Sequence, residues 1–596
     1  MSRTARLLAF FLLPALPGSA AAATITVNDP SDELHGPGCA ATGTGACTLR
    51  DAITFANARR GKDTVVFALG SGPARIALSS PLPAITDPIL LDGTSQPGFE
   101  AAPLVQIDGS SAGEDAVALR ISAGASTVRG FVVSRFAPGA LGAIVLEEKG
   151  GNVLERNFVG VDATGAAAAG NRGHGILVST DGNTIGGAEA GAGNLVSGNA
   201  GDGIRITGSR NLVMANRIGT DAAGVRAIPN RGDGIASGGG NTIGSSVSGA
   251  GNLVSGNGGV GISAGPNDAI LGNFVGTDES GRSALGNGRG GIRGGGKIGG
   301  SDRTSPTGAC SGDCNLVSGN AGPGILPGDA ALVQGNFVGT DAAGTAALAN
   351  RGAGISIQKS VRVTVGGNAP AVRNLVSGNA GAGIELAFEA EGARILGNAI
   401  GVDAVGVERL GNAIGVLVRD GARRNQIGGD SATEGNRIAF NSGAGVEVQF
   451  SAGPGNTIRG NAIYENGGLG IDLGGDGVTE DPPGSAAGLG TFAAFPVLTR
   501  ATPYSVEGTL DAAPSADYTI ELFASPRCDP SGYGEGEAMI ALTTFSTDPA
   551  GHAEFGVSLT APPGQQITAT TTDAAGNTSE FSGCIEVEEP AEPAPD

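Results

Sequence analysis

The chain has 596 residues, 108 of them glycine, and a formal net charge of −21, with no tryptophan and four tyrosines. The acidic balance disfavours nucleic acid and anionic membrane surfaces as partners, because like charges repel. The glycine content, without a strict triplet, excludes collagen and indicates many tight turns. Few aromatic rings are available for stacking on sugars.

The first 23 residues are predicted to be a signal peptide. Arg3 and Arg6 precede an apolar run over 7–16, and alanines at 21–23 offer a cleavage site. The run is too short for a membrane span, and no transmembrane segment is expected elsewhere. The mature chain is therefore predicted to be secreted, either extracellular or associated with the cell surface.

Export changes how the six cysteines are interpreted. In an oxidising compartment they are expected to form disulfides rather than a zinc site, since only three histidines are present. Proximity and domain logic predict the pairs Cys39–Cys47, Cys310–Cys314 and Cys528–Cys584.

Residues 24–90 are predicted to form an N-terminal cap. Thr48 and Asp51 have the spacing of a capping box, and apolar residues over 49–56 recur on one helical face before Gly61. A short amphipathic helix there would cover the open end of a solenoid. Residues 63–69 are predicted to be the first strand.

Residues 91–478 repeat two phrases out of phase. Asn-Phe-Val-Gly-Thr-Asp and its variants begin at Asn157, Asn216, Asn273, Asn336 and Asn398, at intervals of about 60 residues. Asn-Leu-Val-Ser-Gly-Asn begins at residues 194, 252, 315 and 374. Fixed-period repetition indicates a solenoid. We predict a right-handed parallel β-helix whose repeat holds two coils of three short strands, with asparagines hydrogen-bonded from coil to coil.

The C-terminal part changes character. Residues 479–495 are a linker rich in Pro, Gly and Ala, and residues 496–588 contain longer strand candidates separated by turn signals. These indicate a small Ig-like β-sandwich pinned by the last disulfide. Residues 589–596, rich in Pro and Glu, are predicted to be a disordered tail.

Several segments resemble a known family. Cys47-Thr-Leu-Arg-Asp-Ala-Ile53 is similar to the signature of CSLREA-domain proteins, and Leu91-Asp-Gly-Thr-Ser-Gln-Pro-Gly98 and Asn577-Thr-Ser-Glu-Phe-Ser582 also look like that group. The resemblance implies an exported bacterial right-handed β-helix. It carries over no catalytic residues.

The aspartate of the first phrase invites a catalytic interpretation. In all five copies it begins Asp-x-x-Gly, which is typical of a type I turn, and residues identical in every repeat suit scaffolding. These aspartates are Asp162, Asp221, Asp278, Asp341 and Asp403. His174 breaks the repeat within a Gly-His-Gly motif found in polygalacturonases, but their other motifs are absent, so chance is the favoured explanation.

The last coils depart from the repeat in a way that offers stronger candidate site residues. The outward residue of the Gly-Ile/Val-x-Leu/Val strands is Glu385, Leu417, Glu447 and then Asp472. Adjacent coils would place Glu447 and Asp472 about 5 Å apart, as in a retaining glycosidase pair. Asp476, Glu480 and Asp481 follow and would add oxygen ligands for Ca²⁺. A solvated face is the favoured explanation, ahead of a Ca²⁺ site formed by Glu447, Asp472, Asp476 and Asp481 and ahead of a catalytic pair.

The leading hypothesis is a non-catalytic, exported rod that acts as a scaffold or as an adhesion-like binding module. Its expected partner is a polysaccharide or cell-surface ligand, with no cofactor other than a possible Ca²⁺, and a monomer is expected. The alternative is a polysaccharide lyase or glycoside hydrolase of the β-helix type. Its candidate basic residues are Arg419, Arg423 and Arg424, which lie near the acidic coils in the sequence.

Overall fold

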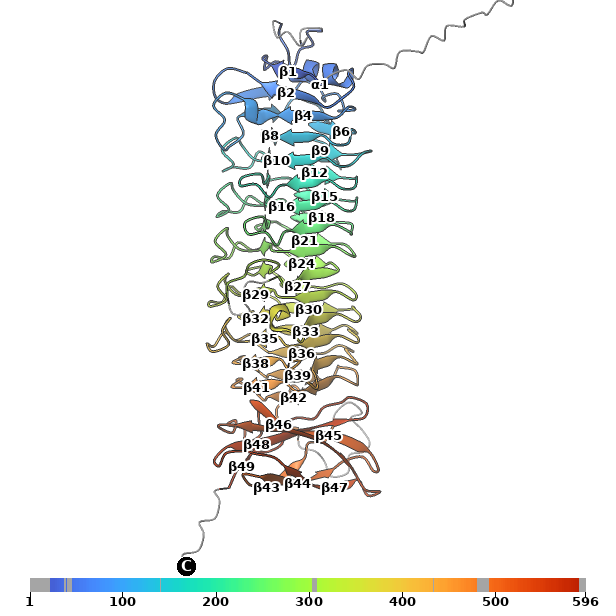
Figure 1. Cartoon of the computed structure of the whole chain (residues 1–596), viewed down its shortest axis with the longest axis vertical. Helices are drawn as coiled ribbons and strands as arrows, with labels where there is room; N and C mark the ends of the chain where they lie inside the picture. The colour runs from blue at the N-terminus through green and yellow to red at the C-terminus, as the bar shows by residue number, and fades with distance from the viewer. Residues whose placement is uncertain are drawn as a thin grey trace, which may run out of the picture.

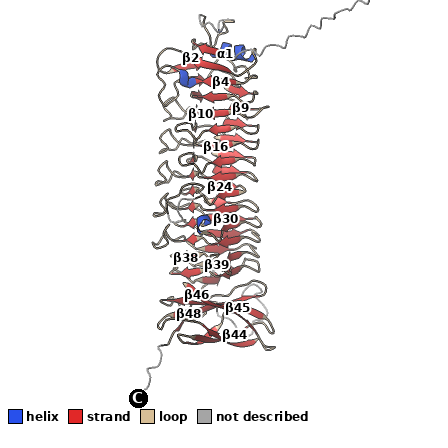
Figure 2. Ribbon diagram, viewed as in Figure 1, coloured by secondary structure: helices blue, strands red, loops and turns tan. Residues whose placement is uncertain are grey.

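The computed structural model describes residues 22–36, 39, 45–139, 141–302, 308–431, 433–479 and 493–588. They form a long column of stacked coils closed at one end by a small antiparallel module (Figure 1). Strands and loops make up almost all of it, and the helices are short (Figure 2). The predicted signal peptide, most of the linker and the tail lie outside the described residues.

Three parallel sheets run along the column, and from residue 89 onward each coil contributes one strand to each sheet. Sheet A contains β1 (Thr24–Val27), β2 (Asp63–Phe67), β4 (Ile89–Asp92), β7 (Thr127–Arg129), β10 (Val153–Glu155), β13 (Thr184–Gly186), β16 (Leu212–Met214), β19 (Thr242–Gly244), β22 (Ala269–Leu271), β25 (Lys297–Gly299), β28 (Leu332–Gln334), β31 (Thr364–Gly366), β34 (Arg394–Leu396), β37 (Gln426–Gly428) and β40 (Thr457–Arg459). Sheet B contains β3 (Ala74–Ala77), β5 (Val105–Asp108), β8 (Phe131–Ser134), β11 (Phe158–Val159), β14 (Leu195–Val196), β17 (Arg217–Ile218), β20 (Leu253–Val254), β23 (Phe274–Val275), β26 (Leu316–Val317), β29 (Phe337–Val338), β32 (Leu375–Val376), β35 (Ala399–Ile400), β38 (Arg437–Ala439) and β41 (Ala462–Tyr464).

Sheet C is the third wall, and its strands follow the Gly-Ile/Val-x-Leu/Val pattern. It contains β6 (Leu119–Ile121), β9 (Gly142–Leu146), β12 (His174–Val178), β15 (Ile204–Ile206), β18 (Ile235–Ser237), β21 (Val260–Ala264), β24 (Gly290–Gly294), β27 (Ile325–Leu326), β30 (Ile355–Gln358), β33 (Ile384–Ala387), β36 (Val416–Val418), β39 (Val446–Gln449) and β42 (Ile471–Gly474). Because equivalent strands of successive coils pair in parallel, the predicted parallel β-helix is confirmed.

The column interior is aliphatic. Each short strand turns one or two side chains inward, such as Ile176, Ile185 and Val196, all of them fully buried. A period of two along each strand puts the intervening residue on the outside. Because every coil repeats this pattern, the buried aliphatic residues form one continuous core from the N-terminal cap to the last coil.

Asparagine ladders run beside this core. In each, the side-chain Nδ2 of one asparagine donates to Oδ1 of the asparagine in the next coil, and at most steps the backbone N–H donates to the same oxygen, as from Asn157 to Asn194 at 3.0 and 3.1 Å. One ladder then continues through Asn216, Asn252, Asn273, Asn315, Asn336, Asn374, Asn398, Asn436 and Asn461. A second runs from Asn171 through Asn199, Asn230, Asn257, Asn287, Asn320, Asn350, Asn379, Asn412 and Asn441 to Asn466. These bonds pair polar groups that lie beside the core, and they confirm the predicted coil-to-coil bonding.

The N-terminal end is covered by α1 (Leu49–Asn57), and 3₁₀ turns occur at Gly93–Ser95 and Pro370–Val372. Thr48 is the N-cap residue, and the reciprocal bonds of a capping box with Asp51 are present, as predicted. Two details differ from the prediction. The helix ends at Asn57 rather than near Gly61, and β1 precedes β2, so the strand predicted at 63–69 is the second strand and not the first.

The C-terminal module consists of two antiparallel sheets. One contains β43 (Val497–Ala501), β44 (Ser505–Asp511) and β47 (His552–Ser558). The other contains β45 (Asp517–Ser525), β46 (Ala538–Ser546), β48 (Gln566–Asp573) and β49 (Ile585–Glu586). All three predicted disulfides, Cys39–Cys47, Cys310–Cys314 and Cys528–Cys584, are formed. None of the described helices is long and apolar enough to cross a membrane.

Candidate functional site

The repeated aspartates are turn residues. The backbone carbonyl of Asp162 accepts from Gly165 N at 3.0 Å, and its carboxylate accepts from Ala166 N and Ala167 N. The corresponding carbonyl bonds form in the other four copies. Burial alone would raise the pKa of Asp162, but bonds from Thr164 and the backbone outweigh it and lower the pKa. These carboxylates therefore stabilise turns, as the sequence pattern indicates.

The glycine of the same turn has a packing role. Gly165 has φ +65°, and a Cβ there would lie about 3 Å from both Phe158 and Leu195, which point outward from sheet B. The same relation holds for Gly281 over Phe274 and Leu316. The turn thus folds back onto the outer face of sheet B, and a side chain at this glycine would collide with that face.

The imidazole of His174 bonds another residue of the fold. Its Nδ1 accepts from the backbone N–H of Asp202 at 2.9 Å and lies 3.4 Å from the Asp202 carboxylate. Burial lowers the pKa of His174, with the Asp202 charge acting against this and Arg205 adding to it. A neutral imidazole that accepts from a backbone N–H is a structural link between coils.

Glu447 and Asp472 are register partners on adjacent strands of sheet C, as predicted. Glu447 Oε1 accepts from Gln449 Nε2 at 2.9 Å, and Asp472 Oδ1 accepts from Gly477 N at 3.3 Å. Burial raises the pKa of Asp472, and the nearby Glu447 and Asp476 carboxylates raise it further. The acidic cluster predicted at the end of sheet C therefore exists, with carboxylates that repel one another.

The basic residues considered for catalysis face other carboxylates. Arg419 donates through Nε and Nη2 to Glu385 Oε1 at 3.0 and 2.8 Å, and it also pairs with Asp420. Arg423 and Arg424 both bond Glu391. These two bonds to one carboxylate oxygen hold Arg419 beside Glu385, which lies three coils from Asp472 along sheet C.

The proposed calcium ligands are only partly visible. Glu447, Asp472 and Asp476 are described, whereas Glu480 and Asp481 lie outside the described residues. Among the residues that the structure does describe, no group of three His, Cys, Asp or Glu side chains is arranged to hold a metal ion. The calcium site therefore stays a prediction that depends on the segment around Asp481.

Three glutamates of the C-terminal module reach the last coils, and the sequence analysis did not identify them. Glu535 Oε1 accepts from Asn466 N and Nδ2 at 2.9 and 3.0 Å. Glu521 accepts from Gly460 N, and Glu580 accepts from Leu473 N at 2.9 Å. Glu535 thus takes the place of the next asparagine in the ladder that ends at Asn466.

Burial raises the pKa of all three glutamates. That of Glu521 rises to about 6 and that of Glu580 to about 7, in both cases against the opposing effect of hydrogen bonds from backbone N–H groups. The Asp472 carboxylate adds to the shift at Glu580. The junction between column and module therefore contains carboxyl groups that titrate near neutral pH.

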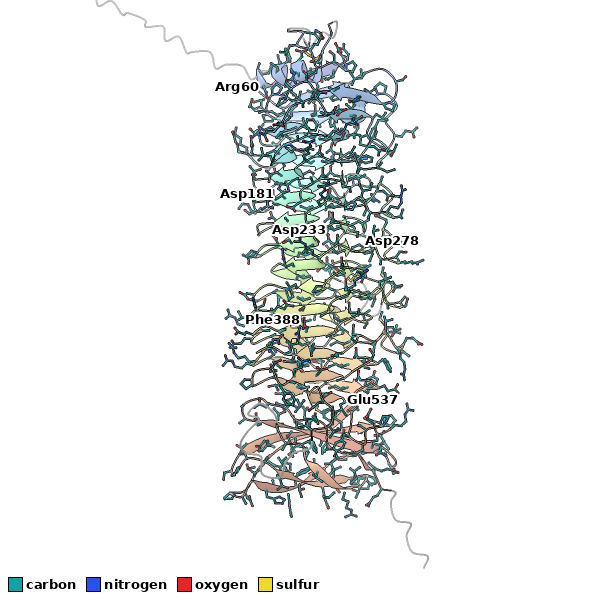
Figure 3. All side chains as sticks on the ribbon, turned by 180° about the vertical axis from the view of Figure 1, so that it is seen from behind. Arg60, Asp181, Asp233, Asp278, Phe388 and Glu537 are labelled. Carbon is teal, nitrogen blue, oxygen red and sulfur yellow. A yellow bond between two sulfur atoms is a disulfide. The ribbon has the colours of Figure 1, made fainter. Side chains whose placement is uncertain are left out.

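A cavity of about 740 Å³ lies over the outer face of sheet B, away from the acidic pair on sheet C. Its lining includes Arg156, Phe158, Arg217, Phe274 and Glu279. Figure 3 labels Asp278, the neighbour of Glu279, among the loops that project from one side of the column. The sequence did contain a signal for this site, since arginine interrupts the repeated phrase at residue 217.

Comparisons with known proteins add little. No family model matches the chain, and no curated protein matches it. Among solved structures, the chain is similar to a PL6 alginate lyase in complex with a trisaccharide, at 12% identity and a TM-score of 0.26, over 67% of this chain and 82% of that one. The assignment of the fold therefore rests on the strand topology of the chain itself.

Proposed function

We propose that the chain is an exported, non-catalytic β-helix rod that acts outside the cell as a scaffold or a glycan-binding module. The observation that supports this most directly is the pairing of Arg419 with Glu385 and of Arg423 and Arg424 with Glu391. A lyase or hydrolase needs a base or acid that is free to exchange a proton with substrate. These arginines are engaged with carboxylates of the chain's own sheet C and its turns.

Export is part of the proposal. The predicted signal peptide and the similarity of residues 47–53 to the CSLREA signature support it, and three disulfides suit an oxidising compartment. A column stiffened by asparagine ladders also suits a protein that holds a surface at a distance. Fractionation of cells that produce the full chain would test export, with the mature protein expected outside the cytoplasm.

A polysaccharide lyase or glycoside hydrolase is the second candidate, and the register pairing of Glu447 with Asp472 is the observation that favours it. One assay distinguishes the scaffold from the enzyme. The purified mature chain is incubated with acidic and neutral polysaccharides, with and without Ca²⁺, and product formation is measured. We expect no turnover. Product that disappears in Glu447→Gln or Asp472→Asn would replace the scaffold proposal with the enzyme.

The predicted calcium site has its own test. If Ca²⁺ binds at the end of sheet C, it stabilises the folded chain and raises the melting temperature. The increase should be smaller in Glu447→Gln than in the unaltered chain. An equal increase in both would remove Glu447 from the site.

A further inference from the structure

The outer face of sheet B differs between its two halves. From β11 onward the first residue of each strand of sheet B points outward, and register pairing aligns Phe158, Leu195, Arg217, Leu253 and Phe274. Further along, Leu316 and Phe337 continue the row but are fully buried, where the turn alanines and the Cys310–Cys314 loop pack against them. Over the first half the row is the floor of the 740 Å³ cavity, and its two phenylalanines are half-buried.

Residues that break the repeat meet in this cavity. Arg217 stands where the other copies of the phrase have Phe or Ala, and Glu279 stands where the other four turns have alanine after the aspartate. They pair with each other, with Arg217 Nη2 2.9 Å from Glu279 Oε1. Neither of these two departures from the repeated residues is needed to form the coils. Their joint presence in one cavity marks this part of the column as different from the rest.

Arg156 is the third break. It directly precedes the first ladder asparagine and has φ +57°, a left-handed conformation that disfavours a side chain. The matching position is glycine in four later coils and alanine in one: Gly272, Gly335, Gly397, Gly460 and Ala215. Four other arginines, at residues 135, 210, 362 and 424, share this conformation, so what distinguishes Arg156 is its place in the cavity lining.

The guanidinium of Arg156 is available to a ligand. Its hydrogen bond runs from Nη2 to the Ala190 carbonyl at 3.3 Å, and no carboxylate pairs with it among the residues that the structure describes. The charge of Arg217 is already balanced by Glu279, and Glu189 lies exposed in the lining. The lining therefore holds two arginines and two glutamates, of which Arg156 and Glu189 have no ion-pair partner among the described residues. Arg156 is the cation of this cavity that is open to an acidic group of a ligand, above an apolar floor.

The shape of the cavity favours an extended ligand. It crosses five strands of sheet B, from β11 to β23, about 19 Å at the spacing of parallel strands. Every one of these strands is paired on both sides, so no free edge exists for a peptide to join by β-augmentation. Flat aromatic and aliphatic side chains with one arginine are better suited to sugar rings that carry acidic substituents.

We propose that this groove binds a linear acidic glycan, with Arg156 holding a carboxylate or sulfate and Phe158 and Phe274 packing against ring faces. This inference rests on the proposed binding role and names its ligand class and site. A sulfated and a uronate glycan share the chemistry that Arg156 recognises. Comparing the affinities of a sulfated and a uronate oligosaccharide distinguishes these two classes of ligand.

The test measures binding of an oligogalacturonate hexasaccharide, a heparin-derived hexasaccharide, cellohexaose and hexaglutamate to the full mature chain by calorimetry. The key variant is Arg156→Gly, which restores the glycine of the repeat and so is expected to fold at least as well. Arg210→Gly is the matched control, because Arg210 also has a left-handed backbone, at φ +56°, but lies away from the groove and pairs with Asp181.

We expect at least one acidic hexasaccharide to bind, Arg156→Gly to weaken it by about tenfold, and Arg210→Gly to change it by less than about twofold. Equal losses in both variants would indicate general electrostatic attraction and overturn the site. Equal binding of hexaglutamate would overturn the glycan assignment. Binding to no probe would also overturn it, and binding that ignores Arg156 would leave the rod as a glycan binder while removing this groove. Turnover of a probe would instead contradict the non-catalytic proposal.

Discussion

The middle of the column and its C-terminal end use different residues to accept the hydrogen bonds of the ladder asparagines. In the middle, each ladder asparagine finds its acceptor in the asparagine of the next coil, as Asn287 does in Asn320. At the last coil no further asparagine follows, and Glu535 of the sandwich accepts the same two bonds from Asn466. A neutral amide is thus replaced by a titratable carboxyl where the column meets the module. The asparagine steps of these two ladders carry no titratable group, whereas the junction should respond to pH.

The largest expected effect is in the middle of the ladder. Asn320→Ala removes the acceptor for Asn287 N and Nδ2 and the donor to Asn350 Oδ1, all in a buried setting. Unfolding by urea should show a loss of about 4 kcal/mol, because several buried polar groups lose their partners. Asn267→Gly, at an exposed left-handed position, serves as control and should change stability by less than about 0.5 kcal/mol. A small loss in Asn320→Ala would mean that the ladder contributes little.

The pH response of the junction comes next. Glu580 has an ordinary pKa of 4.5 when unfolded and about 7 in the folded chain, so the folded state binds its proton more tightly. Its contribution to stability is full below pH 4.5 and is lost as pH rises through about 7, by about 3 kcal/mol in all. Glu521, with a folded pKa of about 6, acts in the same direction.

Melting of the junction at pH 5 and pH 8 would measure this response. Glu580→Gln cannot titrate, so its difference in stability between the two pH values should be smaller than that of the unaltered chain. An identical pH dependence in both proteins would assign the response to other groups. Asp92 and Asp108, whose pKa values are lowered, act in the opposite direction but at lower pH.

A moderate effect is expected from removing the acceptor at the end of the ladder. Glu535→Ala leaves Asn466 N and Nδ2 without their partner, which should cost about 2 kcal/mol. Glu535→Gln keeps an amide oxygen for both bonds and should recover most of the loss at pH 8. Glu537→Ala is the control, since its exposed side chain is labelled near the junction in Figure 3. If Glu535→Ala behaved like this control, the end of the ladder would need no acceptor.

The smallest of these effects lies at the opposite end. Thr48→Ala removes the side-chain acceptor of the α1 capping box and should destabilise the cap by about 1 kcal/mol, measured as a lower thermal midpoint. Thr54→Ala, in the same helix, keeps the cap and serves for comparison. A loss of several kcal/mol in Thr48→Ala would show that the N-terminal cap holds the whole column.

Much of the column could be predicted from the sequence because every coil solves the same packing problem. The phrases containing Asn157 and Asn194 predicted strands, turns and ladder bonds, and the register of Glu447 with Asp472 followed from counting coils. The junction could not be predicted in this way. Glu535 accepts a hydrogen bond from Asn466, 69 positions away in the sequence. This contact occurs only at the junction, so the repeated phrases contain no pattern that predicts it.

The groove on sheet B could be predicted from the sequence only in part. Arg156, Arg217 and Glu279 are visible in the sequence as departures from the repeated phrases. What the sequence does not reveal is that they lie together, because this depends on how each turn folds back over sheet B and on where the Cys310–Cys314 loop covers the row. Departures from a repeat therefore indicate residues worth examining, and the structure decides which of them form one site.

The most direct test of the account is amide hydrogen exchange at the junction. If the sandwich carboxyls continue the column as a rigid rod, the amides of Gly460, Asn466 and Leu473 should be protected nearly as well as that of Asn441 inside the ladder. Protection at Asn466 should fall in Glu535→Ala while that of Asn441 changes less. Exchange of Asn466 in the unaltered chain as fast as an exposed loop would contradict the account, because the module would then not be held to the last coil.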